Sequence, residues 1–504
     1  MATGNVVRRS ELARTEGRNH DLERGIFVDG AVEPVAADAL TITNPATGEI
    51  VGRATKADAA AVDRAVRSAH AAQADWARRG YADRGAVLRA GAEALLERVE
   101  ELIPGLVAEQ GKTVREARIE LRKAADTLEH YAGLAKEVRA AYVHGLDPGV
   151  DGRVLRKPLG VVAAIVPWNF PTTLLSNKLG PALVCGNTVV AKPADTTPFT
   201  TLRLAEILTE AGLPPGVLNV VTGTGPEAGE ALVTHPLTRK VAFTGSTPTG
   251  ERVMALAAKG TKRVTLELGG SDPMIICDDA DLKRAASAAA MGRFYNCGQA
   301  CLAIKRVYVF ASVADEVIEA IAAKASRLRV GIGTDEGVQL GPMHSERQRA
   351  IMEDQIARTL SGGGEVVAGG GRPDDERLRH GWFHEPTVVV DPPHGSPMAR
   401  EEVFGPALPI WRVTDFDQAI QLANDSPFGL GSSVWTASLD RAERAAAEID
   451  AGYTWINSPT KVYDELPFGG VGGSGYGKEH GSEAFDYYTD QKSVVVKRAT
   501  VSPA

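Results

Sequence analysis

Residues 160–170 read GVVAAIVPWNF, a continuous apolar run that ends at a proline and a short polar turn. Strands of a parallel sheet are buried on both faces and have such runs. Three later stretches share this texture: TVVAKPAD (188–195), VLNVVTGTG (217–225) and KVAFTGS (240–246). A helical pattern at 200–212, closed by Gly212, lies between two of them. Strands that alternate with helices predict a parallel α/β sheet.

The flanking sequence extends this organisation. Helical periodicity runs from Ala57 to Glu109, including RGAVLRAGAEALLERVEEL at 84–102, and continues at 121–138. The second half repeats the strand-like texture, which predicts a second α/β domain. Its strand-like stretches are VTLELGG (264–270), PMIIC (273–277), RVYVF (306–310) and SSVWT (432–436), with a helical stretch at 314–328. The segment QKSVVVK (491–497) stands alone and needs a strand to pair with, for which a partner subunit is one candidate.

Composition limits the classes of function. A chain of 504 residues is too long for one core, so two or more domains are expected. The net charge of −8, without a basic run, argues against nucleic acid binding. The charged N-terminus has no signal-like apolar region, and no apolar run approaches the roughly 20 residues that span a bilayer. Four cysteines make no disulfide framework, so we expect a protein of the reducing cytoplasm that binds no membrane.

Two of the cysteines stand four residues apart in FYNCGQACLA, at 294–303. Cys297 and Cys301 have no matching pair of Cys or His nearby, since the nearest histidine is His344. A zinc site is therefore not expected. The residues alone leave open whether one of the two is a nucleophile, a disulfide half or core filler.

Four more stretches place polar groups at expected strand ends, where ligands of open α/β sheets bind. KPAD (192–195) offers Lys192 and Asp195 for ribose hydroxyls, and FTGSTPTG (243–250) is a glycine-rich turn that suits phosphate. ELGG (267–270) offers Glu267 as a general base, and PWNFP (167–171) offers the Asn169 amide to an oxyanion. Taken singly, each stretch also fits an ordinary turn or a solvated loop.

Taken together and in order, PWNFP, KPAD, FTGSTPTG, ELGG, NCGQACLA, EEVFGP and PFGG resemble the aldehyde dehydrogenase superfamily, from about Phe27 to Val495. The resemblance implies a Rossmann-like cofactor domain, an α/β catalytic domain and a small β oligomerisation segment. It implies 25–139 with 161–267 for the NAD-binding domain, 268–477 for the catalytic domain, and 140–160 with 478–500 for the oligomerisation segment. A homodimer or homotetramer is expected.

The resemblance also implies a role for each matched residue. Cys301 is the nucleophile, Asn169 holds the oxyanion, and Glu267 activates water; Cys297 falls on a variable position. NAD is the expected cofactor, because the acidic Asp195 disfavours the extra phosphate of NADP, although Asp is shorter than the Glu usual in the family and some NADP use is possible. The implied cofactor-binding residues are Ile165, Val166, Pro167, Trp168, Lys192, Ala194, Asp195, Gly225, Phe243, Gly245, Ser246, Leu268, Gly269, Glu402 and Phe404.

The substrate, a small aldehyde, is less defined. Phe170, Asn177, Tyr295 and Lys461 are the candidate contacts, but neither an arginine clamp for a carboxylate nor a full aromatic cage is evident. Lys461 would favour an anionic aldehyde, whereas Asp464 and Glu465 would oppose one. The alternatives are a dehydrogenase that acylates coenzyme A and a non-catalytic NAD-binding relative. Whether Cys297 has a redox role also stays open.

Overall fold

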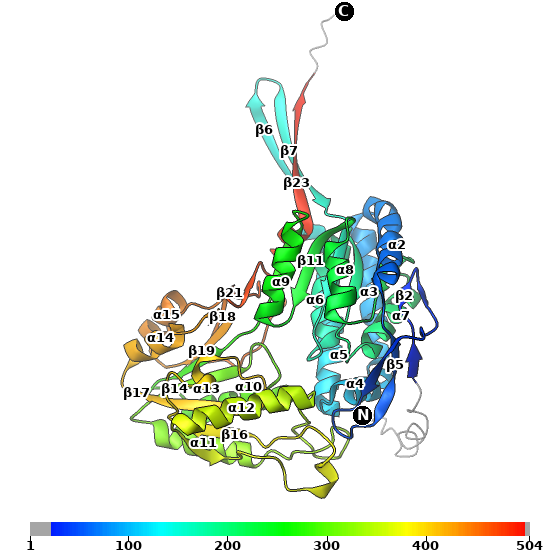
Figure 1. Cartoon of the computed structure of the whole chain (residues 1–504). Helices are drawn as coiled ribbons and strands as arrows, with labels where there is room; N and C mark the ends of the chain where they lie inside the picture. The colour runs from blue at the N-terminus through cyan, green and yellow to red at the C-terminus, as the bar shows by residue number, and fades with distance from the viewer. Residues whose placement is uncertain (1–21, 499–504) are drawn as a thin grey trace, which may run out of the picture.

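The computed structural model describes residues 22–498. The stretch 1–21, which bears most of the expectation about targeting, and the last residues of the predicted segment 478–500 lie outside this range. Figure 1 shows two α/β bodies side by side and a narrow β-sheet that projects from the first. The predicted α/β class is confirmed.

The first body is built on an eight-stranded sheet in the order β22-β12-β11-β8-β9-β10-β2-β3. Its five central strands are parallel, as the apolar runs predict. They are β8 (Val161–Ile165), β9 (Thr188–Lys192), β10 (Leu218–Val220), β11 (Thr238–Thr244) and β12 (Arg263–Glu267). Three short strands complete its edges: β2 (Phe27–Val28), β3 (Ala31–Val32) and β22 (Gly475–Tyr476). The stretch VTLELGG supplies β12 and therefore belongs to this sheet rather than to the second body.

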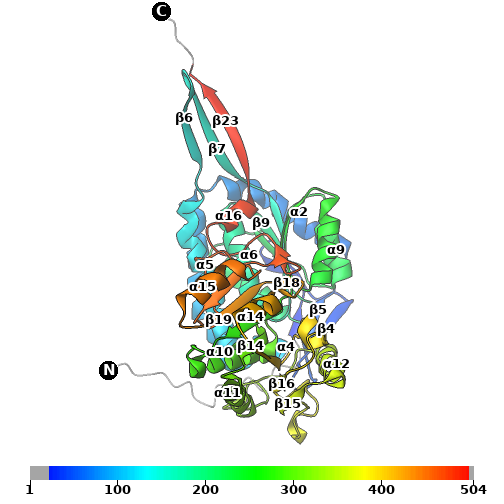
Figure 2. The same ribbon diagram turned by 90° about the vertical axis from the view of Figure 1, so that its left-hand side faces the viewer.

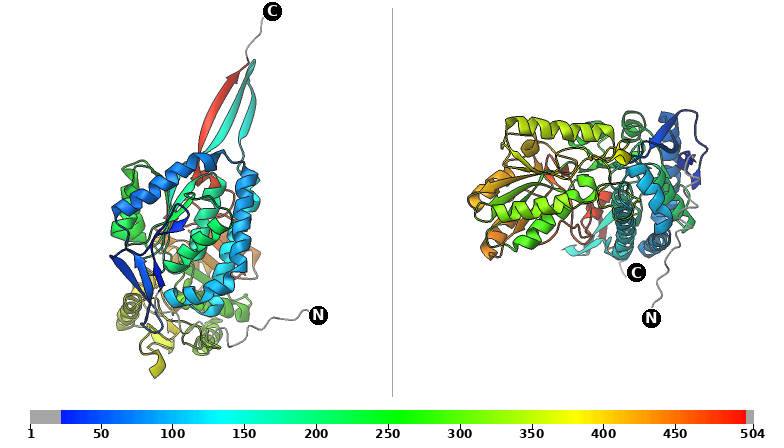
Figure 3. Two further views of the ribbon diagram at one scale, coloured as in Figure 1. Left: turned by 90° about the vertical axis from the view of Figure 1, so that its right-hand side faces the viewer. Right: turned by 90° about the horizontal axis from the view of Figure 1, so that it is seen from below.

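Helices cover both faces of the first sheet, and alternate strand residues face them. Val162 and Ala164 pack into the cluster formed with α3 to α7, whereas Val161 and Ala163 pack against α2, α8 and α9. Figure 3 shows the first of these layers in cyan along the side of the molecule. The helices are α2 (Ala59–Arg78), α3 (Tyr81–Glu97), α4 (Val99–Gln110), α5 (Val114–Gly133), α6 (Pro171–Val184), α7 (Phe199–Glu210), α8 (Glu230–Thr234) and α9 (Thr247–Ala258). The helical stretch at 84–102 is interrupted at Arg98, between α3 and α4.

The second body has a seven-stranded sheet in the order β15-β16-β17-β14-β13-β19-β20. All neighbouring pairs are parallel except β15 with β16. The strands are β13 (Asp272–Ile276), β14 (Ile304–Phe310), β15 (Glu365–Ala368), β16 (Thr387–Val390), β17 (Ala407–Val413), β19 (Gly431–Trp435) and β20 (Tyr453–Ile456). The helices of this half and the closing helix are α10 (Leu282–Phe294), α11 (Ala314–Ser326), α12 (Glu346–Gly362), α13 (Pro397–Arg400), α14 (Phe416–Asn424), α15 (Leu439–Glu448) and α16 (Ala484–Tyr488).

The projecting sheet consists of β6 (Ala141–Asp147), β7 (Val150–Pro158) and β23 (Thr489–Lys497), in the order β23-β7-β6 (Figure 2). The QKSVVVK segment lies in β23 and pairs antiparallel with β7 of its own chain, so its pairing needs no partner subunit. The outer edges of β6 and β23 have no neighbouring strand within residues 22–498. The remaining short strands are β1 (Leu22–Arg24), β4 (Ala39–Thr43), β5 (Ile50–Thr55), β18 (Phe428–Gly429) and β21 (Val471–Gly472).

Candidate active site

A cavity of about 220 Å³ opens between the two bodies at the carboxyl ends of β8, β11 and β12. This edge is where open α/β sheets bind their ligands. The cavity brings together ten of the residues singled out in the sequence. They are Pro167, Trp168, Asn169, Gly245, Ser246, Leu268, Gly269, Cys301, Glu402 and Phe404.

Cys301 lies in the loop before β14 and is the one partly exposed thiol, whereas the other three cysteines are buried. Burial raises the pKa of its thiol to about 12, and the Lys305 ammonium opposes that rise. A thiolate at Cys301 therefore depends on the positive charges around it. The thiol adjoins a small cluster that includes Leu430 and Trp455.

Cys297 has a different environment. Its backbone is left-handed (φ 56°), and its side chain is buried in the apolar core of the second body. All four cysteines are free thiols, and a disulfide between Cys297 and Cys301 would require Cys297 to leave that core. The proposed redox role of Cys297 stays a prediction.

Asn169 is buried at the wall of the cavity, and its amide and its peptide group are both held. Its side-chain Nδ2 donates to the carbonyl oxygen of Gln299 at 3.0 Å. Its own carbonyl oxygen accepts hydrogen bonds from Lys112 Nζ at 2.8 Å and Asn296 Nδ2 at 3.1 Å. An Asn side chain has two amide hydrogens, so one N–H is left for a ligand.

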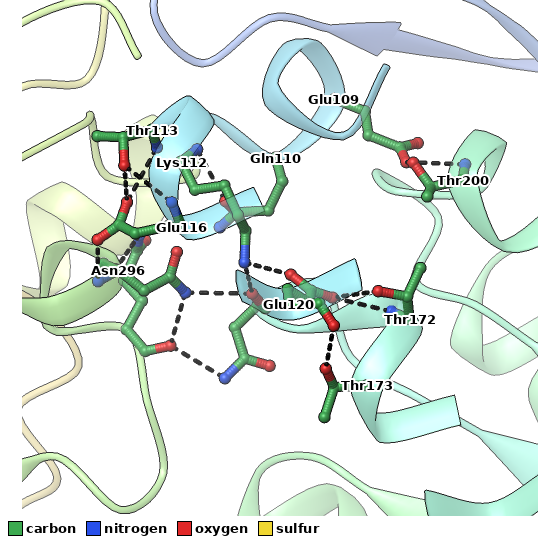
Figure 4. Close-up of polar contacts among 12 residues, drawn as sticks. Glu109, Gln110, Lys112, Thr113, Glu116, Glu120, Thr172, Thr173, Thr200 and Asn296 are labelled. Atoms are coloured by element: carbon green, nitrogen blue, oxygen red, sulfur yellow. Dashed lines mark hydrogen bonds and ion pairs between the residues drawn. The ribbon is translucent and has the colours of Figure 1, made fainter. Parts of the chain in front are cut away.

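Behind Asn169 lies a polar network that sequence reasoning missed (Figure 4). Lys112 and Glu120 form an ion pair of 2.5 Å in which both side chains are fully buried. The other carboxylate oxygen of Glu120 accepts from the backbone N–H and the hydroxyl of Thr172, at 2.9 and 2.8 Å. Glu116 accepts from the Asn296 backbone N–H at 2.7 Å, which fixes the loop that leads to Cys301. The spacing Thr113-x-x-Glu116, which forms a capping box at the start of α5, was the available signal.

Glu267 ends β12 and is buried, yet neither of its carboxylate oxygens has a hydrogen-bond partner in the part of the chain that the structure describes. Burial raises its pKa well above the usual range, and Glu479 adds to this rise, while Lys178 and Lys478 oppose it. Lys178 and Glu479 are themselves a buried ion pair, which the sequence did not reveal. A Cβ at Gly469 would lie 2.6 Å from Glu267 Oε1, so the glycine leaves room for the carboxyl group.

On the other side of the cavity, Glu402 Oε1 accepts from the Gly270 backbone N–H at 3.2 Å and pairs with Lys305 Nζ at 3.0 Å. A Cβ at Gly269 would lie 2.4 Å from Glu402 Oε2, so this position needs a glycine. Phe404 stands edge-on to Trp168, with ring centroids 5.6 Å apart.

The start of α9 forms the third wall. The Ser246 side chain makes no capping bond to the helix; its hydroxyl lies 2.9 Å from that of Thr249. The first N–H groups of this helix therefore lack a side-chain acceptor, which suits an anion such as a pyrophosphate.

The family model for "Aldehyde dehydrogenase family" matches residues 32–494. The chain belongs to the aldehyde dehydrogenase family. Glutarate-semialdehyde dehydrogenase of Pseudomonas aeruginosa is 38% identical over 467 residues, 92% of this chain and 96% of that protein. Betaine aldehyde dehydrogenase of Brucella melitensis is 39% identical over 477 residues, with coverage of 94% and 97%. PnpE from Pseudomonas sp. WBC-3, in its complex with nicotinamide adenine dinucleotide, is 40% identical with a TM-score of 0.93, covering 96% of this chain and 99% of that one.

The remaining residues that family membership marks for a cofactor lie outside the cavity lining. Lys192, at the end of β9, is buried, which lowers its pKa to about 8, and Asp195 opposes this change. Asp195 is exposed, Ala194 is partly buried, and Gly225 is exposed in the turn after β10. Ile165, Val166 and Phe243 are buried, at or next to the ends of β8 and β11.

The structure also places the candidate substrate contacts of this aldehyde dehydrogenase. Phe170 and Tyr295 stack with centroids 5.8 Å apart, and the Lys112 ammonium lies 4.2 Å from the centre of the Phe170 ring. Asn177 is buried, and its Oδ1 lacks a partner among residues 22–498. Lys461 is exposed and reaches over Tyr463 rather than towards the cavity residues above.

Asp464 does not oppose an anionic substrate as expected. It is buried and engaged by Lys123 at 2.5 Å, by the Thr127 hydroxyl at 3.1 Å and by His480 at 2.8 Å. These partners hold the pKa of Asp464 far below its usual range in spite of the opposing effect of burial. Its negative charge is therefore neutralised locally, and only Glu465 of that pair is exposed.

Residues 22–498 contain no cluster of three or more His, Cys, Asp and Glu side chains that could hold a metal ion. Over the same range, no helix combines the length and apolar character needed to cross a membrane.

Proposed function

We propose that this chain oxidises an aldehyde to the carboxylic acid through a covalent thioester on Cys301, with NAD as the preferred cofactor. The observation that carries the proposal is the single cavity lined by Cys301, Asn169, Glu402 and Phe404, with the unpaired carboxyl of Glu267 at its rear. This set combines a nucleophile, an oxyanion donor, a cofactor wall and a base.

In the first step the Cys301 thiolate attacks the aldehyde carbon and forms a C–S bond. The negative charge moves to the aldehyde oxygen, where the second N–H of Asn169 is available to stabilise it. Loss of one such donor costs about 2.7–4 kcal/mol of barrier. The network of Lys112, Glu116 and Asn296 fixes both groups in advance, so little reorganisation accompanies the attack.

Glu267 would release the acid. After the carbon has been oxidised, water must attack the thioester and lose a proton to a base. A buried carboxyl with a raised pKa and no hydrogen-bond partner among the described residues can take that proton close to neutral pH. Cys301 then leaves as the thiolate.

The residues present fit a dinucleotide. The uncapped start of α9 at Ser246 suits a pyrophosphate, and Glu402 can accept from ribose hydroxyls. NAD, when bound, supplies the hydride acceptor. At the end of β9, the exposed negative charge of Asp195 disfavours a ribose phosphate, and the relative PnpE has a structure with NAD.

An uncharged or anionic aldehyde suits this site better than one with a quaternary ammonium. A cage for such a cation needs free aromatic faces. Here Lys112 covers one face of Phe170 and Tyr295 stacks on the ring. We therefore expect a substrate nearer to glutarate semialdehyde, as for one relative, than to betaine aldehyde, as for another.

The test is NADH formation over a panel of uncharged, anionic and cationic aldehydes, with NAD and with NADP. Cys301→Ala should lower kcat/KM by about 10⁴-fold or more, because the covalent route is lost. Cys297→Ala, a change in the apolar core, is the matched control and should keep most of the activity. Full activity of Cys301→Ala, strict dependence on coenzyme A, or a clear preference for betaine aldehyde would contradict the respective part of the proposal.

A homodimer or homotetramer in the cytoplasm also stays a prediction. The unpaired outer edges of β6 and β23 support assembly, because such edges can add strands from another chain. Light scattering of the purified chain measures this directly, and a monomeric mass at micromolar concentration would contradict it.

A further inference from the structure

Lys305 is a buried lysine on β14 that connects the two halves of the candidate site. It is 1% exposed. Its ammonium donates to the carbonyl oxygens of Ala300 at 3.1 Å and Cys301 at 2.5 Å, and it pairs with Glu402 Oε1 at 3.0 Å. One cation thus contacts both the peptide of the candidate nucleophile and the candidate cofactor carboxylate.

The surroundings of Lys305 leave little freedom for this arrangement. The Gly270 backbone N–H donates to the same Glu402 oxygen at 3.2 Å. A Cβ at Gly270 would lie 2.9 Å from the Cys301 carbonyl oxygen and 2.9 Å from Asp272 Oδ1. The Cys301 carbonyl, Glu402 and Asp272 therefore converge on one small volume, and Lys305 is the cation within it.

The charged groups that act on the Cys301 thiol have opposite effects. Burial raises the pKa of the thiol most, Lys305 lowers it, and Asp272, Glu402 and Glu267 raise it further. In a site of low dielectric such contributions are strong. Because Glu402 pairs with Lys305, its negative charge cancels part of the field that the ammonium exerts on the sulfur.

We propose that Lys305 couples binding of the second ribose of the dinucleotide, at Glu402, to ionisation of the Cys301 thiol. The inference rests on the proposed function, which assigns Glu402 to the cofactor and Cys301 to the nucleophile. Ribose hydroxyls that donate to Glu402 draw its charge away from Lys305. The ammonium then acts on Cys301 with less opposition, and the thiol releases its proton to solvent. Lys305 is in this sense a positioning residue that acts through Cys301 and Glu402.

The experiment measures how fast iodoacetamide alkylates Cys301 across a pH series, with peptide mapping to identify the modified cysteine. The thiolate displaces iodide, so the midpoint of the rate profile reports ionisation even if a ligand slows access. Each profile is recorded without nucleotide, with AMP, and with ADP-ribose, which carries the second ribose but no nicotinamide. We expect ADP-ribose to lower the midpoint by about one pH unit and AMP to leave it unchanged.

Two variants decide whether Lys305 is responsible. Lys305→Met should abolish the shift caused by ADP-ribose, while Lys305→Arg, which keeps the charge, should retain it. Calorimetry checks that ADP-ribose still binds Lys305→Met. A shift of wild-type size in Lys305→Met, or no shift in the wild type, overturns the coupling.

If Lys305→Met does not fold, Glu402→Gln provides the decisive comparison. Its midpoint without nucleotide should already equal the lower value, with no further shift on adding ADP-ribose. A midpoint equal to that of the untreated wild type overturns the coupling. By contrast, absence of ADP-ribose binding to the wild type, or alkylation at a cysteine other than Cys301, overturns the proposed function and the coupling together.

Discussion

Two buried carboxylates of this molecule differ in one respect that separates support from chemistry. Glu120 accepts three hydrogen bonds, from Lys112 and from the backbone and hydroxyl of Thr172. Glu267 is equally buried and has no hydrogen-bond partner within residues 22–498. Burying a polar group without partners costs free energy. A satisfied carboxylate stabilises the wall of the site, whereas an unsatisfied one keeps its lone pairs available for a proton.

The largest expected effect tests Glu267 as the base. Glu267→Gln should lower kcat by about 10²–10⁴-fold while the free energy of unfolding changes little or rises. The amide cannot take a proton from water, and the variant removes a buried ionisable group whose pKa is strongly raised. Stopped-flow assays should show a burst of NADH with accumulation of a thioester at Cys301.

The wild-type pH profile belongs to the same test. Glu267 is active when ionised, so kcat should fall as the pH drops below its raised pKa, and Glu267→Gln should lose that limb. Wild-type kcat in Glu267→Gln, or a large loss of stability without a loss of activity, would reverse the distinction between the two carboxylates.

The next effect comes from the same substitution in the other carboxylate. Glu120→Gln leaves the buried Lys112 ammonium without its counter-charge, which should cost about 3–5 kcal/mol of unfolding free energy. The control is Arg118→Ala on the neighbouring helix α5, which removes a surface pair with Glu100 and should cost at most about 1 kcal/mol. Denaturant titration measures both. Equal costs for the two variants would show that the buried pair is not part of the support for Asn169.

The two carboxylates also show what a sequence can and cannot predict. Asn169, Glu267 and Glu402 stand in short runs at the ends of apolar stretches, so local pattern and family resemblance placed them, and the structure brings them around one cavity with Cys301. Their supports lie far away in sequence. Lys112 is 57 positions from Asn169, and Lys178 is 301 positions from Glu479.

Long separations explain the other differences as well. Nothing local to QKSVVVK indicates its pairing with β7, and nothing local to Asp464 indicates its engagement by Lys123 and His480. A lysine inside an apolar run, such as Lys305 in AIKRVYVF, reads as an interruption until its three carbonyl and carboxylate partners are known. Secondary structure follows from local pattern, whereas charge compensation follows from tertiary contacts.

The smallest effect lies where neither burial nor a partner fixes a charge. Lys461 is exposed and makes no ion pair with a described residue. Lys461→Ala should change stability by less than about 0.5 kcal/mol. For an anionic aldehyde such as glutarate semialdehyde, kcat/KM should fall by no more than about fivefold, since an exposed charge contributes about 1 kcal/mol at contact, and added salt should remove the difference. An uncharged aldehyde of the same length is the control. A loss of 100-fold or more, specific to the anionic aldehyde and resistant to salt, would instead place Lys461 in a desolvated binding contact, and the distinction drawn from Glu120 and Glu267 would then extend to the mouth of the site.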